Sequence, residues 1–104
     1  MGRSELVQQL GSMIKKMLPD AQAILYGSQA RGEAKGNSDI DLLILIDRDK
    51  ISPQEENAIT DPIYDLEFKS GIIISPLVMT KKAWEETKKQ TTFYYNVMKD
   101  GILI

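Results

Sequence analysis

The chain of 104 residues contains no cysteine and no histidine. Without cysteine it can form no disulfide and offers no thiolate, either as a nucleophile or as a zinc ligand. Without histidine it has no imidazole base, which excludes a Ser-His-Asp triad. Any chemistry must therefore use carboxylates, hydroxyls, Lys or Arg, backbone amides or a metal ion bound by oxygen ligands.

Long apolar segments and a strong excess of charge are also missing. The longest apolar runs, 42–46 and 72–74, have the length of strands, whereas a membrane span needs about 20 residues. Residues 1–9 are polar and include Glu5, which is not typical of a signal peptide. We therefore expect no membrane segment and a cytoplasmic location. The net charge of -2 disfavours a dedicated nucleic-acid-binding protein, although it leaves a local RNA contact open.

The length fits one domain over residues 1–104. Apolar spacing and capping residues predict four helices: 5–18, 53 to about 66–68, 81–86 and 92–99. Ser4, Ser52 and Thr80 are positioned to cap the first three of them. Pro62 lies inside the second and is expected to break or kink it.

Three short apolar segments predict strands: 21–26, 40–46 and 72–79. The second is almost entirely apolar, which is typical of a central strand that is buried on both faces. The third contains Pro76, which favours an edge position or a bulge. The fold class is therefore α/β (α+β), with a small mixed sheet of three or four strands flanked by helices.

The most informative stretch is 27–32, Gly-Ser-Gln-Ala-Arg-Gly, which directly follows a predicted strand. If a short helix begins at Ser28, its free backbone amides and its dipole favour a bound phosphate. Gly27 allows the backbone to approach that phosphate closely, and Arg31 lies one turn further along. A Gly-Ser pair alone is more often an ordinary turn, and Arg31 could equally pair with Glu33 on the surface.

Asp39 and Asp41 stand two residues apart at the start of the predicted central strand. Because side chains alternate along a strand, both carboxylates are expected on one face. Two negative charges at this distance repel each other unless a cation lies between them, and carboxylate oxygens are ligands that Mg²⁺ prefers. Beside a phosphate site, such a pair resembles the nucleotidyl-transfer arrangement, in which metal ions hold a triphosphate and a hydroxyl displaces pyrophosphate.

Together, the glycine-rich stretch 27–32 and the Asp39-Ile40-Asp41 pair resemble the minimal nucleotidyltransferase family of the polymerase beta-type superfamily. The likeness continues through 75–78 and Trp84 and covers nearly the whole chain. It implies an enzyme that transfers a nucleoside monophosphate from ATP or another triphosphate to a hydroxyl. It also implies that Gly27 and Ser28 contact the phosphates and that Asp39 and Asp41 ligate Mg²⁺.

Members of this family usually carry a third carboxylate on the next strand, as a metal ligand and base. None of the three positions expected to share that face is acidic: Gly71, Ile73 and Ser75. Asp65 or Glu67 could supply the acid only if the strand began earlier, in a hairpin turning at 69–71. Without it, the site could hold one metal ion but would activate a hydroxyl poorly.

Many family members are the antitoxin of a pair with a helical HEPN-type toxin, and some adenylylate that partner. Two hypotheses follow from the resemblance. In the first, the chain is an enzyme with a protein or an RNA terminus as acceptor, and a HEPN-type partner is one candidate. In the second, it is a binding module that caps a partner with little or no catalysis. Trp84, Phe93, Tyr94 and Tyr95 could stack a base, but a place in the core or against a partner is the simpler expectation.

Overall fold

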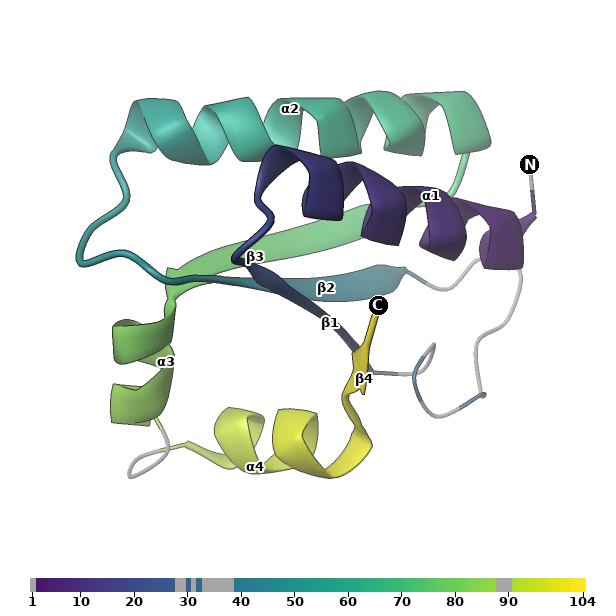
Figure 1. Cartoon of the computed structure of the whole chain (residues 1–104). Helices are drawn as coiled ribbons and strands as arrows, with labels where there is room; N and C mark the ends of the chain where they lie inside the picture. The colour runs from purple at the N-terminus through teal and green to yellow at the C-terminus, as the bar shows by residue number, and fades with distance from the viewer. Residues whose placement is uncertain (1, 28–29, 31, 33–38, 88–90) are drawn as a thin grey trace.

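The computed structural model describes residues 2–27, 30, 32, 39–87 and 91–104 (Figure 1). These residues form four helices and four strands: α1 (Arg3–Met17), β1 (Gln22–Tyr26), β2 (Ile40–Ile46), α2 (Pro53–Ser70), β3 (Ile74–Thr80), α3 (Lys81–Thr87), α4 (Thr92–Asp100) and β4 (Ile102–Leu103). In this part of the chain no helix is long and apolar enough to cross a membrane.

The four strands form one sheet in the order β3-β2-β1-β4. β2 pairs parallel with β3, whereas β1 pairs antiparallel with both β2 and β4. The predicted mixed sheet with a central strand over 40–46 is therefore confirmed. Pro76 lies in β3, which is an edge strand, as the missing backbone donor of proline requires.

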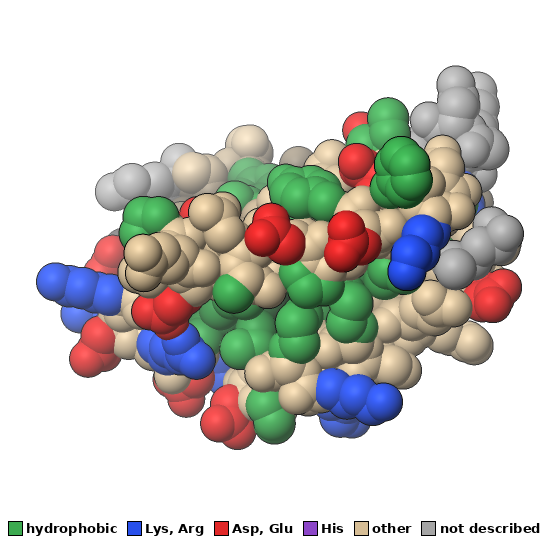
Figure 2. All heavy atoms as spheres, turned by 90° about the horizontal axis from the view of Figure 1, so that it is seen from above, with side chains coloured by type: hydrophobic (Ala, Val, Ile, Leu, Met, Phe, Trp, Pro, Cys, Tyr) green, Lys and Arg blue, Asp and Glu red, His purple; other side chains and the backbone are tan. Residues whose placement is uncertain are grey.

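α1 and α2 cover one face of the sheet (Figure 1). The apolar sides of these helices and the residues of β1, β2 and β3 that face them form the main core: Leu6, Leu10, Ile14, Ala23, Leu25, Ile40, Leu42, Ile44, Ile46, Ile59, Ile63 and Ile74. Seen from the helix side, hydrophobic side chains gather in a central band and charged ones are scattered around it (Figure 2).

α3 and α4 cover part of the opposite face and form a second, smaller core of Leu43, Leu45, Trp84 and Val97. Three aromatic contacts hold this layer together. Phe93 meets Trp84 and Tyr26 edge to face at ring distances of 5.8 and 5.3 Å, and Trp84 lies 4.7 Å from Tyr94. These rings therefore contribute mainly to packing between the helices and the sheet.

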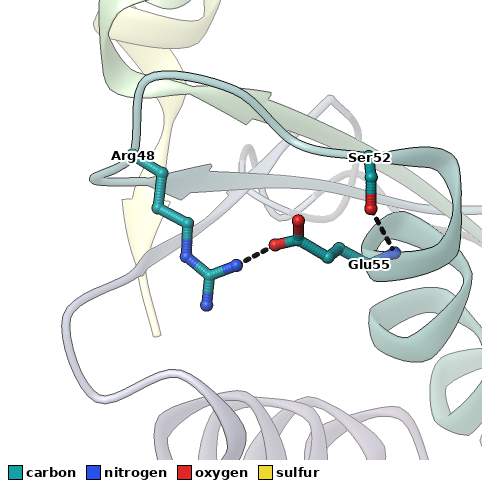
Figure 3. Close-up of polar contacts among 3 residues, drawn as sticks. All are labelled: Arg48, Ser52 and Glu55. Carbon is teal, nitrogen blue, oxygen red and sulfur yellow. Dashed lines mark hydrogen bonds and ion pairs between the residues drawn. The ribbon is translucent and has the colours of Figure 1, made fainter.

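Two of the predicted helix caps are confirmed. Ser52 Oγ accepts a hydrogen bond from the Glu55 N–H at 3.1 Å, and Glu55 also pairs with Arg48 (Figure 3). Thr80 Oγ1 accepts one from the Ala83 N–H at 3.0 Å, which fixes the start of α3 directly after β3. Each bond satisfies one of the backbone donors that a helix start leaves without an intrahelical partner.

Two expectations about the helices are wrong. α1 begins at Arg3, with Gly2 as its cap, so that Ser4 lies inside the first turn and does not cap it. α2 runs without interruption through Pro62 to Ser70, so that Pro62 does not break the helix. Proline removes one helical hydrogen bond, here to the carbonyl of the exposed residue Ala58, and the packing of α2 on the sheet offsets that loss.

The short strand β4 was not predicted, although the sheet was expected to have three or four strands. Its two residues pair with Ile24 and Leu25 of β1, and the Ile104 N–H donates to the Ala23 carbonyl at 2.9 Å. The backbone at Ile104 lies against Gly11 of α1, where an added Cβ would come within 3.3 Å of the Ile104 carbonyl carbon. Gly11 therefore allows this close packing at the centre of the helix.

Candidate active site

The predicted site lies at one end of the strands, where β1 ends and β2 and β3 begin (Figure 1). These three ends meet because β1 is antiparallel to β2 and β2 is parallel to β3. In the resulting register, Asp41 lies between Tyr26 of β1 and Ser75 of β3. The second aspartate of the motif therefore has a defined place between two neighbouring strands.

Asp41 belongs to the odd-numbered positions of β2, which also include Leu43 and Leu45 of the second core. It therefore lies on the sheet face that α3 and α4 cover in part. Leu43 is fully buried there, whereas Asp41 is half-buried and Asp39, just before the strand, is exposed. The two aspartates therefore lie at the start of β2, where the chain passes from the surface into the core.

Gly27 adopts a left-handed backbone conformation, with φ at 74°, at the end of β1. A Cβ at this position would overlap Asp41 Oδ2 and lie 3.4 Å from Asp41 Cγ. The glycine therefore serves two needs, a backbone turn that other residues adopt with strain and the space for the Asp41 carboxylate. The sequence indicated only a close approach of backbone to phosphate, and the approach to Asp41 was not foreseen.

Tyr26 is a neighbour of Asp41 that the sequence analysis missed. Burial raises the pKa of the Tyr26 phenol above its ordinary value, and the negative charge of Asp41 raises it further. Its ring is held by the edge-to-face contact with Phe93. Only the antiparallel pairing of β1 with β2 identifies this neighbour. The sequence does not predict which residues pair, because the 27–39 connection is longer than the short hairpin loops that fix a register.

The strand β3 places Ser75 at the position beside Asp41, and Ser75 is exposed. The hairpin that would have brought Glu67 to this face does not exist, because α2 continues to Ser70. Glu67 Oε2 instead accepts the Ile74 N–H at 2.8 Å and so holds the start of β3. Asp65 is an exposed residue of α2, and no group of three acidic residues that could hold a metal ion occurs in the described residues.

Ser28, Arg31 and Glu33 lie outside the described residues, so their part in a phosphate site stays a prediction. For a metal ion, the candidate donors are the carboxylate of Asp41 and that of Asp39, which precedes it by two residues. Oxygen donors of this kind fit Mg²⁺, which binds one or two carboxylates and completes its shell with water and substrate phosphates. The space that Gly27 leaves beside Asp41 Oδ2 is consistent with such a site.

A mixed sheet with this aspartate near the start of an interior strand, next to a glycine turn, is the arrangement of a nucleotidyl-transfer domain. The chain belongs to the nucleotidyltransferase domain family, which it matches over residues 5–101. It is 33% identical over 78 residues to a protein of Methanocaldococcus jannaschii named "Putative protein adenylyltransferase", covering 75% of this chain and 71% of that protein.

A solved structure shares the fold. A chain in a crystal structure described as "the toxin-antitoxin with AMP-PNP" matches with a TM-score of 0.58 and 15% identity, over 98% of this chain and 72% of that one. At this identity the match concerns the fold. The expected family and the expected α/β fold are both confirmed, and the chain is a nucleotidyltransferase domain.

Proposed function

We propose that the chain is a Mg²⁺-dependent adenylyltransferase that transfers AMP from ATP to a hydroxyl of a protein. The observation that carries the proposal is the position of Asp41, which the register places between Tyr26 and Ser75 and which Gly27 leaves room for. The family match supports nucleotidyl transfer, and the relative named as an adenylyltransferase supports ATP and a protein acceptor.

Each predicted residue has a role in this reaction. Asp39 and Asp41 would hold Mg²⁺, which neutralises charge on the triphosphate and supports the displacement of pyrophosphate. The backbone at Gly27, the Ser28 hydroxyl and the Arg31 guanidinium would bind phosphate oxygens. The acceptor oxygen bonds to the α-phosphorus, the bond to pyrophosphate breaks, and the hydroxyl proton passes to water.

A HEPN-type protein is the acceptor that we test first. The resemblance to minimal nucleotidyltransferases suggests it, and the solved structure with a shared fold comes from a toxin-antitoxin. In this proposal the chain is the antitoxin and modifies its partner.

The experiment is to incubate the protein with ATP labelled at the α-phosphate, Mg²⁺ and a HEPN-type protein encoded beside it. Label should appear on the partner, and only when Mg²⁺ is present. Omission of Mg²⁺ and replacement by ATP labelled at the γ-phosphate serve as controls, because only the AMP moiety is transferred. Label from the γ-phosphate on the partner would contradict the proposal.

The second candidate function is a binding module that caps its partner with little catalysis. The observation in its favour is Ser75, which is not acidic although it lies beside Asp41. Tight binding of the HEPN-type protein without any transfer of label would favour this function over the first. Replacing Ser75 by Asp would then test whether a third carboxylate restores transfer, since Ser75 is exposed and can accept the charge.

A further inference from the structure

The sheet face that carries Asp41 is covered unevenly. On β2, Leu43 and Leu45 are buried at 0% and 3% exposure under α3 and α4. On the same face of β3, Leu77 lies directly beside Leu43 and yet is 39% exposed, and Ile73, the residue just before β3, is 55% exposed. The cover therefore reaches Met79 of β3 but leaves the start of this strand open, with one exposed apolar side chain on each side of Ser75.

The first half of the outer edge of β3 offers no free backbone N–H to a further strand. In the parallel pairing the Ile73 carbonyl accepts the Ile40 N–H, so that backbone donors of the even-numbered residues point away from β2. The first of these, the Ile74 N–H, is bonded to Glu67 Oε2, and the second position is Pro76, which has no donor. Such features protect edge strands from pairing with another chain.

We propose that Ile73, Ser75 and Leu77, the β3 shelf, form the docking surface for the protein acceptor. The inference rests on the proposed function, because it requires that a protein hydroxyl reach Asp41. Ser75 is the direct neighbour of Asp41, so a segment lying on the shelf has its hydroxyl next to the carboxylates. The three shelf residues carry no charge, and the edge beside them has no free backbone N–H at Ile74 or Pro76, so the acceptor contributes apolar side chains flanking the modified residue.

The chain offers a matched control at the other edge of the sheet. Ile102 and Leu103 of β4 are 48% and 64% exposed and pair with β1. The double variant Ile73→Thr/Leu77→Thr therefore removes the shelf, and Ile102→Thr/Leu103→Thr makes the same two changes in the opposite edge strand. Threonine keeps the preference for a strand in both variants.

The test uses two fluorescent peptides that contain one tyrosine, flanked by leucines in one peptide and by glutamates in the other. Binding is measured by fluorescence polarisation without ATP, and Mg²⁺–AMP-PNP binding is measured separately by calorimetry. The wild type should bind the leucine peptide about tenfold more tightly, since burying part of two apolar side chains suffices for that ratio. The shelf variant should lose this preference, and the β4 variant should keep it.

Each failure has its own signature. Equal binding of both peptides by the wild type, or a preference that survives in the shelf variant, overturns the docking surface. If the shelf variant loses AMP-PNP instead of the peptide, the shelf holds the nucleotide base and the proposal is wrong. If the wild type prefers the leucine peptide through the shelf but binds no AMP-PNP, the docking surface stands and the proposed transferase function fails.

Discussion

The two faces of the sheet differ in how completely they are packed. The face under α1 and α2 has a continuous core of twelve buried residues, and its helices have 15 and 18 residues. The face under α3 and α4 has four buried residues, and its helices have 7 and 9 residues. Asp41 lies on this second face, at the end that the helices leave open.

This difference assigns separate tasks to the two faces. The first contributes most of the apolar burial and so most of the stability of the domain. The second combines a small core with the half-buried Asp41, where we propose that a nucleotide and an acceptor bind. Substitutions on the first face should therefore lower the stability of the domain. Substitutions near Asp41 on the second face should weaken the binding of the nucleotide or the acceptor.

The sharpest test of the packing difference uses two neighbouring leucines of β2. Leu42 and Leu43 are both fully buried, but they face α1/α2 and α3/α4 respectively. Leu42→Ala should lower the free energy of unfolding by about 3 to 4 kcal/mol and Leu43→Ala by about 2 to 3, because the shorter helices can close around the smaller side chain. Urea denaturation followed by circular dichroism measures both. A larger loss for Leu43→Ala would contradict the comparison.

The next test separates backbone strain from the space that Asp41 needs. Gly27 and Gly71 have left-handed φ values of 74° and 72°, but only Gly27 lies against another group, the Asp41 carboxylate. Gly27→Ala and Gly71→Ala should each cost about 1 to 2 kcal/mol of stability from backbone strain. Only Gly27→Ala should also weaken the binding of Mg²⁺–AMP-PNP. Equal nucleotide binding by the two variants would show that the carboxylate tolerates the methyl group.

The smallest expected effect concerns Tyr26 at alkaline pH. Its pKa is raised in the folded chain, so that the unfolded chain loses this proton first as the pH rises past about 10. Stability that is present below that pH is therefore lost above it. In Tyr26→Phe the decrease of the thermal midpoint with pH in this range should be shallower than in the wild type. An unchanged slope would mean that Tyr26 does not contribute to the alkaline loss of stability.

The sequence predicted the elements of both faces, because their apolar spacing is regular. Leu6, Leu10 and Ile14 mark the buried side of α1, and the apolar run of β2 marks the central strand. What could not be predicted depends on contacts between segments far apart in the chain. β4 is too short to show a period, Tyr26 and Ser75 are identified by register, and Glu67 is placed by a helix that continues past Pro62.

The central claim is that the open end of the second face binds the nucleotide through Asp41. Calorimetric titration with AMP-PNP, with and without Mg²⁺, tests it in the wild type, Asp41→Asn and Asp47→Asn. Asp47 follows the other end of β2 and is exposed, so its variant makes the same change away from the site. Asp41→Asn should lose the Mg²⁺-dependent binding, about 100-fold or more in affinity, and Asp47→Asn should keep it. Mg²⁺-dependent binding that survives in Asp41→Asn would contradict the claim.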